Sequence, residues 1–389
     1  MKAFQQSPTD PAFVQNPYPF YAQLRAAGDV IWWDDYNMAC ATTHRAVTGA
    51  LRDRRMGREI PADQAPAIPD HLAPFYANEA HSMLELEPPR HTRLRSLVLR
   101  AFTSRRISAL DPEITALSHA LIDAFPQDAA FDLLPLFAQP LPVRIIARLL
   151  GVPEGDSDQL LAWSNAMVAM YQARRTRAIE TTASQATKDF SAYLTDFIAH
   201  KRKMPGDDLI STLIAAEEDG SKLNHAELIS TCILLLNAGH EATVHTIGNG
   251  VKALLEHDNP KITPGTVEEI FRFDAPLHMF TRWVYEDLDF FGTPLKKGDQ
   301  LACLLGSANR DANTYTDPNV FDITRKGAAH TSFGGGIHFC VGAPLARLEV
   351  QIALRTLRSR CPNLKLTSAP SYSNSYHFHG LTSLMVTKN

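Results

Sequence analysis

The sequence predicts a mainly α protein with a few small β-sheets, and three observations support this fold class. Apolar residues recur at three- and four-residue spacing through most of residues 91–256, as in amphipathic helices. The longest such stretch, residues 225–256, is apolar on all sides between Cys232 and Ala238 except at Asn237, which predicts a helix buried in the molecule. After residue 281 the pattern changes to short β-type runs separated by turns.

Each remaining element has its own local signal. Residues 17–27 predict a short amphipathic helix, and residues 30–33 and 38–42 predict a hairpin. Asn224 and Glu227 form a capping-box pattern at the start of the long helix. Strands are expected at residues 283–285, 288–290 and 301–304, with turns at Gly292 and at Lys297-Gly298, and a last long helix is expected after Cys340, with Leu345, Leu348, Ile352 and Leu357 on its apolar side.

Residues 57–83 differ from their surroundings. They contain Pro61, Pro66, Pro69 and Pro74 and show little helical periodicity. A long irregular segment in a compact domain usually serves function, so we expect a functional loop here.

Composition excludes several classes of protein. The chain has 389 residues, of which 45% are hydrophobic and 21% charged, and without a low-complexity linker or internal repeat it is expected to form one domain over residues 1–389. Its five scattered cysteines predict no disulfide framework, which suits the reducing cytoplasm. The N-terminus resembles neither a signal peptide nor an anchor, and no run of about 18 apolar residues predicts a membrane span. A net charge of −4 gives no reason to expect nucleic acid.

The most informative segment is residues 333–342, which read Phe-Gly-Gly-Gly-Ile-His-Phe-Cys-Val-Gly. Pro344 suits the first turn of a following helix, so Cys340 is expected at a helix N-terminus, where a thiolate is stabilised. A cysteine of the core would not need the preceding glycines. A phosphate loop would need Gly-Lys-Ser/Thr, and a zinc site would need further cysteine or histidine nearby. A single thiolate fits axial ligation of haem iron best.

A second unusual feature lies in the middle of the long helix. Gly239 costs roughly 1 kcal/mol against alanine inside a helix, which suggests that something presses on the helix there. Glu241 places a carboxylate in an apolar stretch, which indicates a functional role unless it lies on a solvated face. His240 and His245 do not share a helix face, so the pattern is not that of a zinc protease, and the glycines at 248 and 250 lack the strand that a dinucleotide site requires.

The pattern Phe333-Gly334-x-Gly336-x-His338-x-Cys340-x-Gly342 resembles the haem-binding loop of the cytochrome P450 family. The resemblance covers nearly the whole chain, from residues 17–20 to residues 379–381, and is strongest to the soluble bacterial members. It implies a large helical domain with small β-sheets on one side and a haem b cofactor, iron protoporphyrin IX, with Cys340 as the iron ligand.

The resemblance also assigns other residues. His91, Arg95, Arg282 and His338 would meet the haem propionates, with Phe333, Gly342 and Ala238 also beside the cofactor. Glu269 and Arg272 match the Glu-x-x-Arg pair of the family, expected to brace the haem side of the core through the segment from Asn309-Arg310 to Arg325. Taken alone, each of these charges would pass as an ordinary surface charge or exposed ion pair.

The oxygen-activation segment departs from the family pattern. Glu241 stands at the acidic position, but Ala242 replaces the usual threonine and the hydroxyl appears at Thr243. Either Thr243 with ordered water or a hydroxyl of the substrate would replace the missing alcohol.

The resemblance further implies a monooxygenase that takes electrons from NAD(P)H through a ferredoxin reductase and a ferredoxin, uses O2 and acts on a small, apolar or aromatic molecule. The substrate wall is expected from residues 57–83, from residues 163–175 with Trp163, Met167, Met170 and Tyr171, and from Leu235, Ala238, Leu277 to Phe280, and Phe378, although such residues are more often plain core. A ferredoxin would meet a basic patch of Arg325, Lys326, Arg347, Arg355, Arg93, Arg100, Arg105 and Arg106. A peroxygenase, dehydratase or isomerase, and less so a haem-based sensor, stay open as alternatives.

Overall fold

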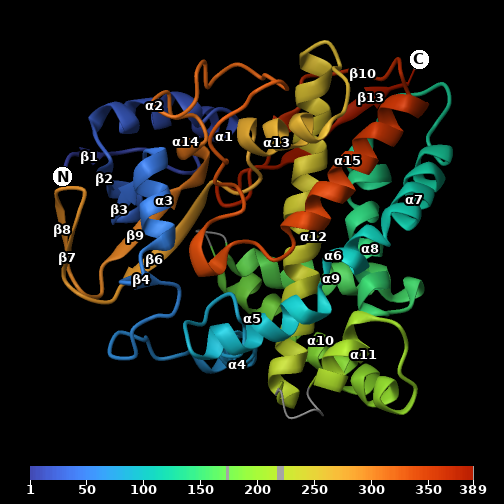
Figure 1. Ribbon diagram of the computed structural model, residues 1–389, viewed down its shortest axis with the longest axis horizontal. Coiled ribbons are helices and arrows are strands. Elements are labelled where there is room, and N and C mark those ends of the chain that lie inside the picture. Colours follow the sequence, from blue (N-terminus) through green and yellow to red (C-terminus); the bar gives the residue numbers. More distant parts are fainter. Residues whose placement is uncertain (172–174, 217–222, 389) are drawn as a thin grey trace. The chain divides into compact units, whose positions relative to one another are not determined.

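The computed structural model describes residues 1–171, 175–216 and 223–388 (Figure 1). The chain forms two compact units, each built from separate segments. Unit 1 comprises residues 1–64, 114–138 and 242–389, and unit 2 comprises residues 65–113 and 139–241. Helix α12, His225–Glu256, has the bounds predicted from the sequence and contributes residues to both units.

Unit 1 contains a six-stranded mixed sheet in the order β1-β2-β3-β9-β6-β4. The predicted hairpin is confirmed, since β2 and β3 pair antiparallel, with Val30 opposite Ala41. The central strand β9 runs parallel to β3 and antiparallel to β6. The bounds of the six strands are β1 Ala3–Phe4, β2 Val30–Trp33, β3 Met38–Ala41, β9 Gln300–Leu304, β6 Met279–Val284 and β4 Met56–Gly57.

Three smaller sheets complete the strands of unit 1. The pairs are β7 with β8 and β11 with β12, while β13 lies between β10 and β5. Their bounds are β5 Phe131–Asp132, β7 Leu288–Phe290, β8 Thr293–Leu295, β10 Lys365–Leu366, β11 Ser371–Tyr372, β12 Leu381–Ser383 and β13 Met385–Thr387.

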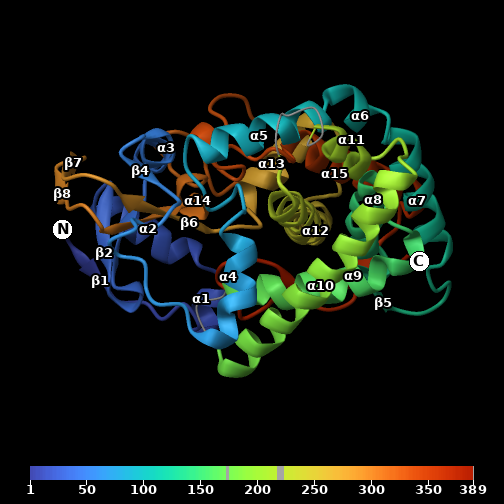
Figure 2. The ribbon, with the colours of Figure 1, turned by 90° about the horizontal axis from the view of Figure 1, so that it is seen from below.

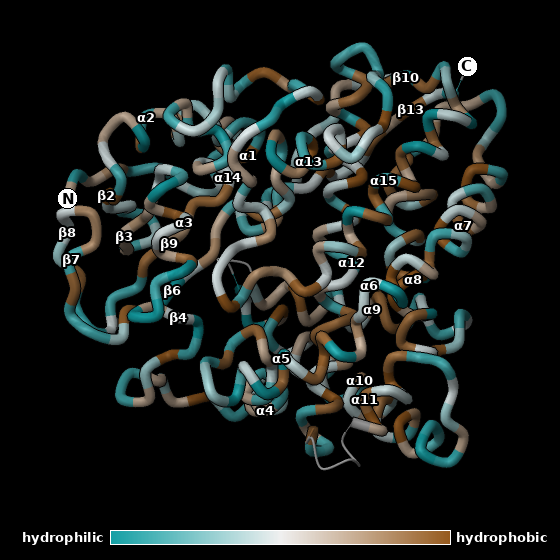
Figure 3. Tube along the Cα trace, viewed as in Figure 1, coloured by the Kyte–Doolittle hydropathy of each residue, from teal (hydrophilic) through white to brown (hydrophobic). Residues whose placement is uncertain are grey.

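The helices of unit 1 pack against this sheet and against one another. Helix α3 contacts β9, α14 contacts both α2 and α3, and α13 contacts α15. Figure 3 shows polar and apolar residues interleaved along α15, as expected for a helix with one buried face. The helix bounds are α1 Pro11–Gln15, α2 Tyr18–Ala27, α3 His44–Arg52, α13 Pro264–Phe273, α14 Leu305–Ala308 and α15 Ala343–Arg360; α7, Asp111–Asp123, also lies mainly in this unit.

Unit 2 is helical. Its longest member, α10, packs against α4, α9 and α11, and Figure 2 shows it beside α4 and α9. The predicted capping box at the start of α12 is confirmed, because Asn224 and Glu227 exchange backbone-to-side-chain hydrogen bonds of 3.0 and 2.9 Å. The bounds are α4 Ala73–Glu79, α5 Arg90–Ala101, α6 Ser104–Ser108, α8 Pro140–Leu150, α9 Ser157–Val168, α10 Arg177–Lys203 and α11 Leu209–Ala216.

Two expectations need correction. Residues 57–83 are not wholly irregular, because Pro74 stands in the first turn of α4 and its missing N–H is not needed there. Strand β6 begins at Met279, earlier than expected, since its pairing with β9 already includes Met279 opposite Leu304. Within the described part of the chain, no helix has the length and apolar content needed to span a membrane.

Candidate functional site

Residues 333–342, here called the thiol loop, lead directly into α15 (Figure 1). The backbone N–H of Cys340 donates a 2.9 Å hydrogen bond to the carbonyl of Phe333, and α15 begins three residues later at Ala343. Pro344 lies in the first turn of the helix, as the sequence predicts. Cys340 is therefore held next to the positive end of a helix, which favours the thiolate.

Gly336 shows why the thiol loop needs glycine. Its φ is +65°, and a Cβ atom there would lie 2.3 Å from the carbonyl oxygen of Leu51 near the end of α3. Any other residue would be strained and would collide with backbone. The glycine allows α3 to press on the loop and so fixes the path of the chain toward Cys340.

Cys340 differs from the four other cysteines, all of which the structure describes. Cys40, Cys232, Cys303 and Cys361 are buried, whereas Cys340 is partly accessible, and none of the five forms a disulfide. Burial raises the pKa of Cys232 to about 12 and that of Cys303 to about 11, which keeps these thiols protonated. The position of Cys340 is thus the one suited to a ligand or nucleophile.

Two further sequence-predicted residues lie in unit 1 with the thiol loop. Arg282 is on β6, is only 3% exposed, and donates from Nη1 to the carbonyl of Thr281 over 2.9 Å. His338 closes the short 3-10 turn Gly336–His338. Both place a cationic type of side chain in the unit that carries Cys340.

Gly342 and Phe333 also have defined places in the loop. Gly342 is the N-cap of α15, and a Cβ atom on it would meet the Sγ atom of Cys340 at 3.8 Å. The ring of Phe333 is buried, and the guanidinium of Arg347 lies over it in a cation–π contact, 4.5 Å from the ring centroid. The contact between Phe333 and Arg347 joins the start of the loop to α15.

The other two predicted propionate ligands lie in unit 2. His91 and Arg95 are one turn apart on α5 and therefore share a helix face. His91 is buried and Arg95 is half-buried. Their common face confirms the geometry expected from the spacing, while their role stays a prediction.

Helix α12 is buried from Leu228 to Val251 except at Gly239 and along one narrow band. Ala238 is exposed, and Glu241, Ala242 and His245 are partly exposed. These four residues, here called the open stripe, follow the i, i+3, i+4, i+7 spacing of a single helix face. An otherwise buried helix thus offers two small side chains, one carboxylate and one imidazole on one accessible side.

Gly239 has a packing explanation. A Cβ atom there would lie 2.9 Å from Cγ1 of Ile146, which belongs to α8 in the same unit. The neighbour that presses on α12 is therefore a side chain of the protein. Sequence reasoning detected the close approach but could not identify its source.

Glu241 is neither sealed nor fully solvated. Its side chain is 22% exposed, and one of its oxygens lies 3.4 Å from Nε2 of the buried His240. The other ring nitrogen of His240, Nδ1, is 2.8 Å from the carbonyl of Leu236. A carboxylate in this position keeps access to water and lies within ion-pair distance of a neighbouring imidazole.

Ala242 and Thr243 lie on different sides of α12. Ala242 belongs to the open stripe, whereas Thr243 is 4% exposed and points away from it. The accessible face of α12 therefore has no threonine hydroxyl at position 242, and the hydroxyl of Thr243 does not replace it there. His245, which the zinc-protease pattern left without a role, lies on that face one turn beyond Glu241, a position that helical periodicity alone could have shown.

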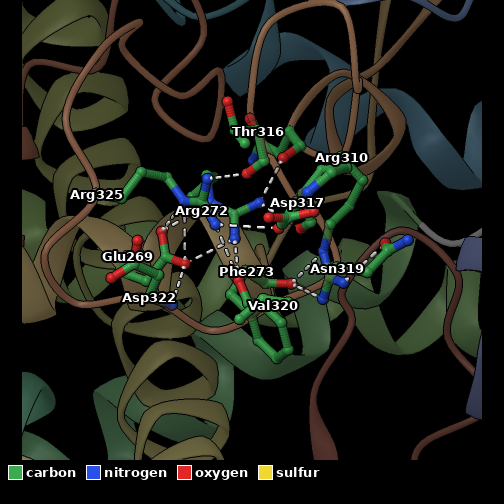
Figure 4. A network of polar contacts seen from close by, with 12 residues as sticks. Glu269, Arg272, Phe273, Arg310, Thr316, Asp317, Asn319, Val320, Asp322 and Arg325 are labelled. Atoms are coloured by element: carbon green, nitrogen blue, oxygen red, sulfur yellow. Dashed lines mark hydrogen bonds and ion pairs between the residues drawn. The ribbon is translucent and has the colours of Figure 1, made fainter.

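Glu269 and Arg272 form a sealed pair on α13 (Figure 4). Two nitrogens of Arg272 each donate to Glu269 over 2.7 Å, and the side chains are only 2% and 3% exposed. The remaining donors of Arg272 reach the carbonyls of Asn309, Pro318 and Val320. All five N–H groups are used, so the interpretation as a surface ion pair is wrong.

Arg325 extends this network, as Figure 4 shows. Its Nε donates to Glu269 over 3.2 Å, and its terminal nitrogens bind the carbonyls of Thr316, Asp317 and Val320. The backbone N–H of Asp322 also donates to Glu269. The expected link between the Glu-x-x-Arg pair and the segment up to Arg325 is therefore present in the structure.

The substrate residues predicted in unit 1 lie around the open stripe and the thiol loop. Leu277 forms an isolated β-bridge with Phe378, and the ring of Phe378 lies 5.8 Å from that of His245. Phe280 packs on Gly334, where a Cβ atom would meet its ring at 3.3 Å.

The substrate residues predicted in unit 2 fall into two groups. Met167, Met170 and Leu235 are buried, and the sulfur of Met167 lies 3.9 Å from Nδ2 of Asn237 on α12. Trp163 instead packs between α9 and α10, with its ring 5.4 Å from that of Phe190. Residues 172–174 of the predicted wall 163–175 lie outside the described residues.

The predicted basic patch is weaker than its sequence suggests. Arg347 pairs with Glu268, Arg325 with Glu269, Arg93 with Glu227 and Arg106 with Asp207, each within its own unit. These partners neutralise much of the charge. Lys326, Arg355, Arg100 and Arg105 remain as exposed cationic residues.

Comparison with known proteins identifies the class to which this fold and loop belong. The family described as "Cytochrome P450" matches residues 63–263 and 258–361. The chain is 38% identical to "Cytochrome P450 monooxygenase PikC" of Streptomyces venezuelae, over 92% of this chain and 87% of the relative. It is also 38% identical to "Vitamin D(3) 25-hydroxylase" of Pseudonocardia autotrophica, over 96% and 94%.

A solved structure, described as "Crystal Structure of P450BioI in complex with hexadec-9Z-enoic acid ligated Acyl Carrier Protein", has a TM-score of 0.91 at 35% identity and covers 97% of this chain and 99% of its own. The chain therefore belongs to the cytochrome P450 family. It has the P450 fold and is a cytochrome P450 monooxygenase with haem b as cofactor.

The described residues fit this cofactor. A partly accessible thiol stands at a helix N-terminus, the donor type that P450 iron requires. Ile337 and Phe339, on either side of His338, are 38% and 41% exposed, so the thiol loop presents apolar surface suited to a porphyrin. The open stripe of α12 presents small side chains, which allow a flat group to approach closely.

Proposed function

We propose that Cys340 is the axial ligand of the haem iron and that the protein inserts one oxygen atom of O2 into an apolar substrate. The observation that carries this proposal is the placement of Cys340, the accessible cysteine of the five, at the start of α15. His91, Arg95, Arg282 and His338 bind the propionates, since arginine suits bidentate recognition of carboxylates. Bound haem supplies the activation of dioxygen.

The protein's own contribution to this reaction is to deliver protons on the open stripe. Glu241 takes up protons from water, because it is partly exposed, and passes them along the accessible face of α12. Ala242 offers no hydroxyl on this face, and Thr243 is buried away from it. A hydroxyl of the substrate, or water ordered by Thr243, therefore completes the proton path.

The substrate is an apolar molecule that meets Leu277 and Phe378 beside the open stripe, with Phe280 at the thiol loop. The vitamin D(3) hydroxylase and the complex with an acylated carrier protein support an apolar substrate of this kind, free or carried on a protein.

Electrons reach the enzyme from NAD(P)H through a ferredoxin reductase and a ferredoxin. The exposed Lys326, Arg355, Arg100 and Arg105 supply positive charge for an acidic donor. If the rate of reduction by ferredoxin does not depend on salt or on charge reversal at Arg105, this partner assignment fails.

The test of the ligand is the optical spectrum of dithionite-reduced protein under carbon monoxide. The wild type is expected to show the red-shifted band of thiolate-ligated haem, and Cys340→Ser is expected to lose it. Cys361→Ser, which changes a buried thiol, is the matched control and should keep the band. A globin-like spectrum of the wild type would overturn the assignment.

The test of the reaction is turnover of the same substrate under two conditions. A monooxygenase requires O2 with ferredoxin and NAD(P)H, whereas a peroxygenase turns over with peroxide alone, and a dehydratase or isomerase needs neither oxidant. Incorporation of one labelled atom from 18O2 into the product would establish the proposed reaction.

A further inference from the structure

A cluster of buried polar side chains lies in unit 1, at the end of α13 and just before β6 and β12. Asp274 directly follows α13, His278 directly precedes β6, and His379 lies two residues before the start of β12. The three side chains offer a carboxylate oxygen and two ring nitrogens that all lie within 4.8 Å of one another. All three residues are at least 95% buried.

We propose that Asp274, His278 and His379 form a binding site for a divalent transition-metal ion, with Zn²⁺ as the expected occupant. Two imidazoles and a carboxylate are a ligand set typical of zinc. This inference does not depend on the haem chemistry proposed above.

The distances suit a tetrahedral ion. Nε2 of His379 lies 3.4 Å from Oδ1 of Asp274, and ligands of a tetrahedral zinc ion at about 2.1 Å from the metal are about 3.4 Å from each other. All three ligand atoms lie within 4.8 Å of one another, so a side-chain adjustment is enough to bring the widest pair to the spacing of a tetrahedral ion.

His278 provides independent support. Its Nδ1 lies 2.9 Å from the hydroxyl of Tyr21, whereas its Nε2 is buried and has no hydrogen-bond partner among the described residues. A buried imidazole nitrogen without a partner is costly. A metal ion bound at Nε2 would remove that cost, and the bond at Nδ1 would fix the orientation of the ring.

Neighbouring hydroxyl groups hold the carboxylate of Asp274 in place, as is expected for a metal ligand. The hydroxyl of Tyr18 donates to one of its oxygens over 3.1 Å, and the hydroxyl of Tyr372 donates to the other. The ring of Tyr372 also stacks on that of His379 at 3.8 Å between centroids. Outer-shell hydrogen bonds of this kind are usual at metal sites.

A cavity of about 500 Å³ within unit 1 gives access to the cluster, because Asp274 and His379 are among its lining residues. The lining also includes Arg310 and Lys252. Their positive charge opposes a bare cation but favours an anion or hydroxide as the fourth ligand. The cavity thus supplies both an entry path and an open coordination position.

The molar ratio of zinc to haem iron tests the proposal, because the amount of haem iron measures the amount of folded protein. Holoenzyme is dialysed against Zn²⁺, passed through a desalting column and analysed by elemental mass spectrometry. One zinc per iron is expected for the wild type, and at least tenfold less for His379→Gln and His278→Gln. His200→Gln, which changes an exposed histidine on α10, is the control and should bind as the wild type does.

Retention of the haem spectrum shows that each variant is folded, and anomalous diffraction at the zinc edge of wild-type crystals gives a second measurement that needs no variant. An anomalous peak between the three side chains supports the proposal. A wild-type ratio near zero, equal binding by all variants, or a peak elsewhere overturns it.

Discussion

Two carboxylates on helices of this protein, Glu269 and Glu241, have opposite surroundings. Glu269 on α13 is 2% exposed and receives hydrogen bonds from Arg272, Arg325 and the backbone of Asp322. Glu241 on α12 is 22% exposed and lies beside the imidazole of His240. The first is suited to hold segments together, and the second keeps the access to water that proton transfer requires. A glutamate that is buried in ion pairs thus stabilises the fold, whereas a glutamate that stays partly exposed to water can transfer protons.

The largest effect is expected from breaking the sealed carboxylate network. Arg272→Leu removes five donors and leaves the buried Glu269 with only Arg325 and the backbone N–H of Asp322 among the partners described above. This should lower the free energy of unfolding by about 3–5 kcal/mol. Arg45→Leu is the control, since Arg45 is 73% exposed in its pair with Asp29, and it should cost less than about 1 kcal/mol. Urea unfolding followed by circular dichroism measures both. Similar costs for the two variants would show that burial does not distinguish them.

The open carboxylate should affect turnover rather than stability. Glu241→Gln keeps the shape of the side chain but removes its proton chemistry, so product formation should fall about 100-fold. The free energy of unfolding should stay within about 0.5 kcal/mol. Glu256→Gln, at the end of the same helix, should leave turnover unchanged. A variant at 241 that keeps its rate would remove Glu241 from the proton path.

The face on which a hydroxyl lies should matter more than its presence. Ala242→Thr adds a hydroxyl to the open stripe and should raise the product formed per NADH by up to about tenfold, or 1.4 kcal/mol, for a substrate without a hydroxyl of its own. Thr243→Ala should change this yield less, because Thr243 is buried off the stripe. A larger loss for Thr243→Ala than the gain at 242 would instead place Thr243 and its water in the path.

A third carboxylate, that of Glu268, is ion-paired like Glu269 but exposed to solvent like Glu241, and its substitution should have the smallest effect. Burial raises its pKa, but hydrogen bonds from Arg347 and His330 outweigh this and lower the pKa from 4.5 to about 2. The stabilisation is therefore fully present above pH 4.5 and is lost as the pH falls toward 2. Because the side chain is 43% exposed, Glu268→Gln should cost only about 1 kcal/mol at pH 7.

The difference between Glu268→Gln and the wild type should vanish near pH 2. Unfolding curves at pH 7, 4 and 2 measure this, with Glu286→Gln at an exposed position as the control. A constant difference at all three pH values would mean that packing, and not charge, stabilises the protein at this residue.

Local patterns in the sequence predicted much of the fold and part of the candidate site. The bounds of α12 and the exchange of bonds between Asn224 and Glu227 follow from periodicity and capping, which act between near neighbours. The thiol loop could be found because its glycines, cysteine and proline are contiguous. The start of α4 was not predicted, because residues 57–83 contain four prolines and show little helical periodicity, although Pro74 in fact stands in the first turn of this helix.

Features made by tertiary contacts could not be predicted in the same way. Nothing near Gly239 identifies Ile146 as the side chain that presses on it. The carbonyls of Pro318 and Val320 that receive the donors of Arg272 have no signature in their side chains. Asp274 and His379 meet across about 100 residues of chain, a distance at which local patterns carry no information.

The unequal burial of the five thiols has a practical consequence. A maleimide reagent added to native protein would find one reactive position, because the other four sulfurs are shielded and protonated. Haem bound at Cys340 would block that position. The fraction of protein that reacts with maleimide therefore measures the molecules that lack haem, whereas the absorbance of the preparation measures those that contain it.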